Sequence, residues 1–200
     1  MLKRYIMGAV AALAFSSSAS SANAATTIIS EDFEATPYNF TFNGNVFLAN
    51  GAIYGPCCGT PADTSNTFVA FGGGNAPSGN ILSTSFNTFL GSLYTVNFDF
   101  KAFGGGSESL TFQVGSQTHT VNPIADNTLN FSSASFNFLG TGALTTLKVF
   151  SGGVNNVDAA VDNITISAVP EPELWAMMIF GFGLIGLQMR RRRKLITVTA

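Results

Sequence analysis

The sequence predicts an all-β protein, a single β-sandwich of the jelly-roll type, between an N-terminal signal peptide and one C-terminal transmembrane helix. Residues 25–168 are rich in Phe, Ser, Thr, Asn and Gly and contain few good helix formers, which favours strands and turns. The segment Tyr94–Ala102 alternates strictly between apolar and polar residues, the pattern of a half-buried antiparallel strand. Gly- and Asn-rich stretches at 72–75 and 104–106 separate short apolar runs, as in a sandwich.

Each of the remaining candidate strands is a short run of apolar, β-branched or aromatic residues bounded by turn residues. No convincing helix is expected before the C-terminal tail. The candidate strands besides Tyr94–Ala102 are Thr26–Phe33, Phe40–Leu48, Phe68–Phe71, Ile81–Phe86, Leu110–Val114, Thr118–Val121, Thr128–Phe138, Leu144–Phe150 and Val161–Ser167.

The N-terminus has the three parts of a secretory signal peptide. A basic start at residues 3–4 precedes a short apolar run at 6–15, and small polar residues follow. Ala22 and Ala24 fit the A-x-A cleavage pattern, so we expect residues 1–24 to be removed after Ala24. The apolar run of about ten residues is too short for a bilayer core, which needs roughly 20.

The C-terminus predicts a membrane helix over residues 174–189, a stretch without charge. Sixteen helical residues at ~1.5 Å each reach about 24 Å, slightly less than the ~30 Å of a bilayer core. A basic stop-transfer cluster follows and predicts a cytoplasmic tail at 195–200. The G-x-G-x-x-G pattern at 181–186 does not follow a strand, which argues against a nucleotide site. The stop-transfer cluster comprises Arg190, Arg191, Arg192, Arg193 and Lys194.

Residues 169–194 resemble the PEP-CTERM sorting signal in its PEPxxWA variant, a tail also catalogued as an ice-binding protein C-terminal domain. The resemblance implies export through the secretory translocon, removal of the leader by signal peptidase, and cleavage near Pro-Glu-Pro by exosortase. It implies an intermediate anchored in the inner membrane with its passenger in the periplasm, and then the outer surface or extracellular matrix of a Gram-negative bacterium. The motif residues would be substrate rather than catalytic residues, and a plain proline linker above a membrane anchor is the alternative. They are Pro170, Glu171, Pro172, Trp175 and Ala176.

The passenger domain, residues 25–168, is strongly acidic. It keeps only Lys101 and Lys148 against nine acidic residues, a net charge of −7. Binding to phosphate backbones needs clustered Lys and Arg, so nucleic acid is excluded as a partner. The same charge predicts repulsion from an anionic lipid surface.

The passenger resembles the jelly-roll modules of carbohydrate-binding families at 31–34, near the mature N-terminus, and at 161–164, which opens the last strand. In such modules acids at these places hold a structural calcium. Asp162 shares parity with Ile164 and Ile166, so it is expected to face the core, where an unpaired carboxylate is costly. Glu34 and Asp162 are therefore the candidate calcium ligands, and no other cofactor is expected. The alternative is that Asp162 caps a turn.

Cys57 and Cys58 are adjacent in a chain expected to meet oxidising conditions. They can pair with each other, pair between chains or stay free, and a vicinal disulfide is the favoured arrangement. His119, the only histidine, is expected on a strand, and no nucleophile-elbow pattern accompanies it.

These features favour a non-catalytic exported surface or matrix protein that associates with exopolysaccharide in a biofilm. A secreted hydrolase acting on polysaccharide is one alternative, but no acid pair stands out among the nine acids. A purely structural protein without a ligand is another. The alternating aromatics at 38–42 and 136–138 could form a sugar platform, although a place in the sandwich core is the favoured interpretation.

Overall fold

The computed structural model describes residues 25–72, 80–104, 108–152, 158–170 and 172–195. The predicted signal peptide, with Ala22 and Ala24, lies outside these residues, as do Glu171 and the tail at 196–200. The side chains of Cys57 and of residues 172–176 and 191–195 also lie outside the description.

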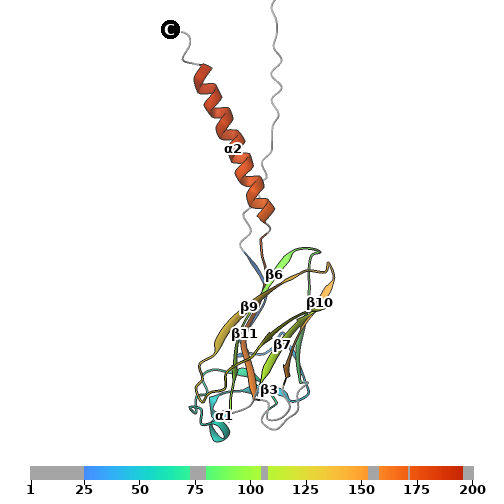
Figure 1. The fold of residues 1–200 in the computed structure, drawn as a ribbon, viewed down its shortest axis with the longest axis vertical. Coiled ribbons are helices and arrows are strands. Elements are labelled where there is room, and N and C mark those ends of the chain that lie inside the picture. Colours follow the sequence, from blue (N-terminus) through green and yellow to red (C-terminus); the bar gives the residue numbers. More distant parts are fainter. Residues whose placement is uncertain (1–24, 73–79, 105–107, 153–157, 171, 196–200) are drawn as a thin grey trace, which may run out of the picture.

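Two antiparallel sheets pack face to face and form the predicted sandwich (Figure 1). The six-stranded sheet has the order β3-β4-β11-β6-β9, with β1 paired to β11, and the five-stranded sheet has the order β2-β5-β10-β7-β8. The elements are β1 (Thr26–Glu31), β2 (Thr41–Asn43), β3 (Val46–Ala49), α1 (Gly51–Cys58), β4 (Phe68–Phe71), β5 (Ile81–Asn87), β6 (Leu93–Ala102), β7 (Ser109–Val114), β8 (Gln117–Val121), β9 (Ser132–Leu139), β10 (Leu144–Gly152), β11 (Ala159–Ala168) and α2 (Pro172–Leu195).

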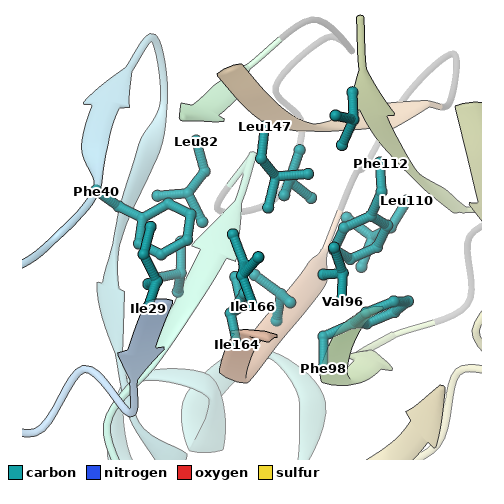
Figure 2. Close-up of a cluster of buried hydrophobic side chains, with 14 of the residues drawn as sticks. Ile29, Phe40, Leu82, Val96, Phe98, Leu110, Phe112, Leu147, Ile164 and Ile166 are labelled. Atoms are coloured by element: carbon teal, nitrogen blue, oxygen red, sulfur yellow. The ribbon is translucent and has the colours of Figure 1, made fainter. Parts of the chain in front are cut away.

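The sandwich core is formed by alternate side chains of both sheets. Strand β6 follows its predicted alternation, with Tyr94, Val96 and Phe98 at 1%, 0% and 1% exposure. The rings of Phe98 and Phe112 stack across the two sheets with centroids 3.7 Å apart. Figure 2 shows side chains of both sheets meeting in this cluster, so the phenylalanine-rich composition is used to fill the interior.

A second, smaller apolar cluster lies on the other face of the six-stranded sheet, under α1. Tyr54 of α1 stacks on Phe103 with ring centroids 4.3 Å apart, and Phe68 and Ala160 complete the packing. Helix α1 therefore covers part of a sheet face that would otherwise be exposed.

Helix α1 contradicts the expectation that no helix precedes the tail. Asn50 caps its first turn by accepting a hydrogen bond from the Ile53 amide at 3.2 Å, and Gly59 ends it in the left-handed region at φ 67°. The sequence pattern hid the helix because it is short and contains Pro56.

Most predicted strands differ from those in the structure by one or two residues at an end, and two differ by more. The segment Phe40–Leu48 forms two strands, β2 and β3, because Gly44 turns the chain at φ 74°. Strand β9 begins at Ser132 rather than at Thr128, since Thr128 accepts a hydrogen bond from the Asn130 amide and closes a local turn.

Helix α2 includes all of the residues 174–189 that were expected to cross a membrane. Within the described ranges, however, no helix combines the length and the apolar character of a bilayer-spanning segment. The predicted transmembrane helix is therefore not confirmed: its uncharged stretch of sixteen residues is bounded by Glu173 and Arg190.

Candidate functional sites

A continuous polar surface covers the outer face of β9, β6, β11 and β1, and we call it the polar ladder. Its side chains alternate with the core residues of the same strands and hydrogen-bond across neighbouring strands: Thr95 donates to Asn137 at 2.7 Å, and Asn97 donates to Thr165 at 3.2 Å. The ladder comprises Thr27, Thr95, Asn97, Asp99, Ser133, Ser135, Asn137, Asn163, Thr165 and Ser167.

An open pocket of about 340 Å³ lies within the polar ladder. Asp99 is central to it, because its two oxygens accept hydrogen bonds from Ser133 at 2.6 Å and from the Asn163 side chain at 2.8 Å. Asn97 and Ser135 line the same pocket. The pocket offers hydroxyl, carboxamide and carboxylate groups on a fixed strand scaffold, a set that can hydrogen-bond the hydroxyls of a sugar.

The predicted calcium ligand Asp162 is buried, at 1% exposure, but on the face opposite to the expected one. Strand β11 has an irregularity after Asp162, where Asn163 adopts the left-handed region at φ 49°. The extra residue reverses the alternation, so Asp162 pairs with Asp99 on the outer face while Ile164 packs in the core. The parity argument was therefore wrong, although the conclusion that this carboxylate is buried is correct.

The Asp162 carboxylate is held by protein donors. One oxygen accepts from the Asn66 side chain at 2.9 Å and the other from the Asn163 amide at 2.8 Å. Burial raises the pKa of Asp162 to about 6, and the charges of Asp99 and Glu34 add to the rise, while the two hydrogen bonds oppose it. Glu34 itself accepts a hydrogen bond from the Thr67 amide at 2.6 Å.

The charge of Glu34 thus acts on the carboxyl group of Asp162. Among the described residues, no group of three or more His, Cys, Asp or Glu side chains is arranged to hold a metal ion. A cation here would take ligands from these two carboxylates and from neutral oxygens, a mixture typical of calcium.

Sequence reasoning placed Glu31 in the motif at 31–34 but did not single out its role; it is a buried acid on the core side of β1. Its oxygens accept hydrogen bonds from the Phe33 amide at 3.2 Å and from the Asn39 amide and side chain at 2.6 and 3.1 Å. The residue therefore fixes the loop after β1. Parity with Ile29, which faces the core, was the signal that could have revealed it.

A second pair of buried acids lies beside α1. Glu108 and Asp158, at 5% and 4% exposure, precede β7 and β11, and the Asp158 amide donates to Glu108 at 2.6 Å. Burial and then the charge of Asp158 raise the pKa of Glu108 to about 7, while that hydrogen bond opposes the rise. Burial and then both acids raise the pKa of Tyr54, so its phenol stays neutral. Each acid follows a Gly-rich stretch and directly precedes an apolar strand, and this position in the sequence could have pointed to the two acids.

The cysteines end helix α1. Cys58 is disulfide-bonded and 8% exposed, and the Cys57 side chain lies outside the described part of the chain. The vicinal pairing of the two stays a prediction.

The aromatic residues pack as core side chains rather than as a sugar platform. Phe40 and Phe138 are buried at 6% and 1% exposure, and Phe136 packs against the core. His119 is half-buried and stacks on Phe136 with ring centroids 5.1 Å apart, across the edge between β8 and β9. Its place is that of a structural side chain that closes this edge.

The sorting-signal residues follow the sandwich without an intervening element. Strand β11 ends at Ala168, Pro170 follows, and α2 begins at Pro172 and includes Trp175, Ala176 and the basic cluster from Arg190 to Lys194. Figure 1 shows α2 leaving the sandwich at the end opposite to α1.

Comparison with solved structures defines the fold as that of carbohydrate-binding modules. The chain is similar to the xylan-binding CBM22-1 domain of Paenibacillus barcinonensis Xyn10C, with a TM-score of 0.52 and 16% identity over 75% of this chain and 99% of that domain. It is also similar to the CBM22-1-CBM22-2 tandem of the same protein, with a TM-score of 0.52 and 17% identity over 76% of this chain and 48% of that one.

A third similar structure is the CBM22-1-GH10 part of Clostridium thermocellum xylanase 10B, complexed with xylohexaose. The TM-score is 0.52 and the identity 14%, over 72% of this chain but only 28% of the xylanase chain. Similarity at these identities shows the fold alone. No curated protein matches the sequence significantly.

The tail is identified by its own family model. Residues 168–193 match the PEP-CTERM protein-sorting motif, which confirms the resemblance drawn from residues 169–194. This motif implies an exported protein that is anchored in a membrane before its tail is cleaved.

Proposed function

We propose that this chain is a non-catalytic surface or extracellular-matrix protein, cut by an exosortase, whose sandwich associates with exopolysaccharide through the polar ladder. The observation that carries the proposal is the direct succession, in one chain, of a sandwich similar to carbohydrate-binding modules and a PEP-CTERM sorting motif. The expected partners are the secretory translocon, signal peptidase, the inner membrane before cleavage, exosortase and the matrix polysaccharide.

The polar ladder supports weak, extended binding rather than tight binding. Its described side chains offer hydrogen bonds without an aromatic ring among them, and hydrogen bonds to a sugar replace hydrogen bonds to water with little net gain. We therefore expect a Kd of about 1 mM per site, or roughly −4 kcal/mol. Many copies on one polymer would then hold the protein in the matrix through avidity.

Affinity electrophoresis in gels containing the matrix polysaccharide tests this site. The wild-type protein should be retarded, and Asn97→Ala and Ser135→Ala should each reduce the retardation because they remove donors and acceptors from the pocket. Thr111→Ala, on the outer face of β7 in the other sheet, is the matched control and should migrate as wild type. Equal retardation of all variants would exclude the polar ladder as the binding site.

The alternative, a polysaccharide hydrolase, predicts release of reducing sugar. Glycosidases need two carboxyl groups that flank the scissile bond and are reachable by the substrate. At the pocket, Asp99 faces Asp162 in the strand register, and Asp162 is 1% exposed, so this pair is poorly placed for the chemistry. Binding without sugar release would support the proposal, whereas sugar release would favour the hydrolase.

Processing is tested by fractionating matched cells with and without exosortase. We expect the tail peptide to remain attached in the strain without exosortase and to be absent from the surface or matrix fraction of the strain with it. A Glu171→Ala variant should behave, in the exosortase strain, like wild type without exosortase. If the tail stays attached equally in both strains, the sorting proposal is wrong.

We also propose a structural calcium at Glu34 and Asp162. The charge of Glu34 contributes to the raised pKa of Asp162, and a cation bound between the two carboxylates would offset this repulsion. Calcium should raise the Tm of the wild type, and Asp162→Asn should abolish this response. The control Asp126→Asn, in a loop that contacts Lys101, should retain it. Titration calorimetry without calcium-linked heat, together with an unchanged Tm, would remove the idea.

A further inference from the structure

Two loops lie side by side at the end of the sandwich from which the tail departs. Residues 88–92 connect β5 to β6, and residues 140–143 connect β9 to β10. The loops are joined by backbone hydrogen bonds: Gly91 donates to Gly140 at 3.0 Å, Gly140 donates to Ser92 at 2.9 Å, and Thr88 donates to Ala143 at 3.2 Å.

Four exposed large apolar residues lie in or directly beside these loops, and we call them the apolar tip. They are Phe89, Leu90, Leu139 and Leu144, which are 79%, 81%, 55% and 68% exposed. Phe89 and Leu90 lie in the first loop, whereas Leu139 ends β9 and Leu144 begins β10 on either side of the second loop. Scattered single exposures of this kind are ordinary, but four at one end of the sandwich are of the kind that marks an interaction site.

The apolar tip is a fixed structure. The buried Tyr94 hydroxyl accepts a hydrogen bond from the Phe89 amide at 2.8 Å, so the loop that carries Phe89 and Leu90 is tied to the core. The Thr141 amide donates to the Thr88 hydroxyl at 3.1 Å and joins the two loops, and the Thr88 hydroxyl lies 2.8 Å from that of Thr145 in β10. At Gly142, with φ 77°, an added Cβ would lie 2.9 Å from the Leu90 side chain, so close packing of the two loops requires glycine there.

The sorting tail leaves the sandwich beside the apolar tip. The Val169 amide donates to the Leu93 carbonyl at 2.8 Å, directly after the first loop. Three residues separate the end of β11 at Ala168 from the start of α2 at Pro172, and three extended residues reach only about 11 Å. Whatever holds α2 therefore holds this end of the sandwich close to itself.

The distribution of charge over the domain also distinguishes the end beside the tail from the opposite end. The two loops and the flanking Leu139 and Leu144 carry no charged residue, in a domain whose net charge is −7. Acids gather instead at the α1 end, where Glu108 and Asp158 flank Tyr54 and where Asp126 contacts Lys101. An uncharged apolar end faces the tail, and an acidic end faces away from it.

We propose that the apolar tip contacts the lipid bilayer that holds the tail and inserts its four side chains among the lipids. This contact orients the sandwich with the tip toward the membrane until the tail is cut. The inference rests on the proposed function, because it requires the tail to be membrane-anchored. This orientation also reduces the expected repulsion between the acidic domain and anionic lipids, because the acids at the α1 end are held away from the membrane. Once the tail is removed, the tip alone provides weak adhesion and the passenger leaves.

Tryptophan quenching by brominated lipids tests the proposal in the full chain. The passenger contains no tryptophan, and the only one in the chain is Trp175. In a Trp175→Phe background, Leu90→Trp places a single reporter on the apolar tip, and Ile124→Trp places the matched control. Ile124 is 88% exposed and lies at the opposite end, beside the bridge between Ala102 and Ala125.

Both proteins are reconstituted into vesicles of phosphatidylcholine and phosphatidylglycerol with brominated acyl chains. The Leu90→Trp fluorescence should be quenched several-fold more strongly than that of Ile124→Trp, and its emission should shift to the blue. Adding Leu144→Ser to the Leu90→Trp protein should reduce the quenching, with near-UV circular dichroism as the check that the sandwich is folded.

The outcomes separate this inference from the proposed function. If the full chain does not float with the vesicles, the membrane-anchored tail itself is refuted. If it floats but the two tryptophans are quenched equally, the tail is anchored and the proposal for the apolar tip is overturned. Crosslinking from residue 90 to exosortase without any quenching in lipid vesicles would likewise overturn it, in favour of a protein partner.

Discussion

Glu108→Gln probes a buried carboxyl group whose pKa is raised far above its ordinary value. The Glu108 side chain is 5% exposed, and one oxygen accepts the Asp158 amide at 2.6 Å. The other oxygen, Oε2, has no hydrogen-bond partner within the described part of the chain. Tyr54 and Asp158 are the titratable groups that face it. Burial raises the pKa of Glu108 from 4.5 to about 7, and the charge of Asp158 contributes to the rise.

The direction of the pH dependence follows from proton binding. Between pH 4.5 and about 7 the folded protein holds a proton on Glu108 that the unfolded chain has lost. Stability is therefore fully present below pH 4.5 and falls as the pH rises through this window. A shift from 4.5 to about 7 corresponds to a loss of about 3 kcal/mol above pH 7, at ~1.4 kcal/mol per pH unit.

Glutamine removes this loss, because it is neutral at every pH and still offers an oxygen to the Asp158 amide. At pH 8 the Glu108→Gln variant should be more stable than wild type by up to about 3 kcal/mol, or roughly 6–12 °C in Tm. At pH 4.5 the two should be nearly equal.

Thermal unfolding followed by circular dichroism from pH 4.5 to 8 measures both curves. The control is Asp126→Asn, whose carboxyl is exposed and whose pKa is held at about 2, chiefly by its hydrogen bond from Lys101. Its stabilising contribution is present above pH 3.8 and is lost below that value, so the difference between this control and wild type should be constant from pH 5 to 8. A Glu108→Gln curve parallel to wild type between pH 5 and 8 would refute the reasoning.

Three further outcomes follow from the packing. Asp126→Asn should lower the Tm in thermal melts more than Lys101→Met does. The first variant leaves the 3%-exposed Lys101 without its carboxylate partner, whereas the second replaces the buried ammonium group with an apolar one. Phe112→Ala should cost about 3–5 kcal/mol in denaturant unfolding, since it empties the ring position that stacks on Phe98; a cost below about 1 kcal/mol would contradict this packing. Mass spectrometry without reductant should find Cys58 oxidised within a single chain, and a dimer linked through the cysteines would exclude the vicinal arrangement.

The central strands could be predicted from the sequence because their physics is local. In β6 one face packs on the core and the other meets water, so residues such as Val96 and Asn97 had to alternate in polarity. Lys101 fits the same alternation and yet is buried, because the loop that carries Asp126 covers the outer face at that point. The sequence determines which face a side chain takes, whereas its exposure depends on loops from distant parts of the chain.

Helix α1 and the buried acids were not predictable by the same means. Helix α1 has only eight residues and depends on the Asn50 cap and on the packing of Tyr54 against Phe103, contacts that join segments 49 residues apart. Glu108 and Asp158 precede strands of different sheets, and only the completed sandwich brings them together. Their pairing carries no signal along the sequence.

The side-chain alternation of β11 reverses at Asn163, and this reversal explains both why Asp162 was predicted on the wrong face and how the polar ladder is formed. A regular strand would place Asp162, Ile164 and Ile166 on one face, and the buried carboxylate would then lie among core side chains. Asparagine tolerates the left-handed backbone, so one extra residue fits into β11 and the alternation changes sides. The same residue donates its backbone amide to Asp162 and its side chain to Asp99. The irregularity therefore keeps the core apolar on both sides of the reversal, and it places two carboxylates next to each other on the outer face, where the pocket and the proposed calcium site meet.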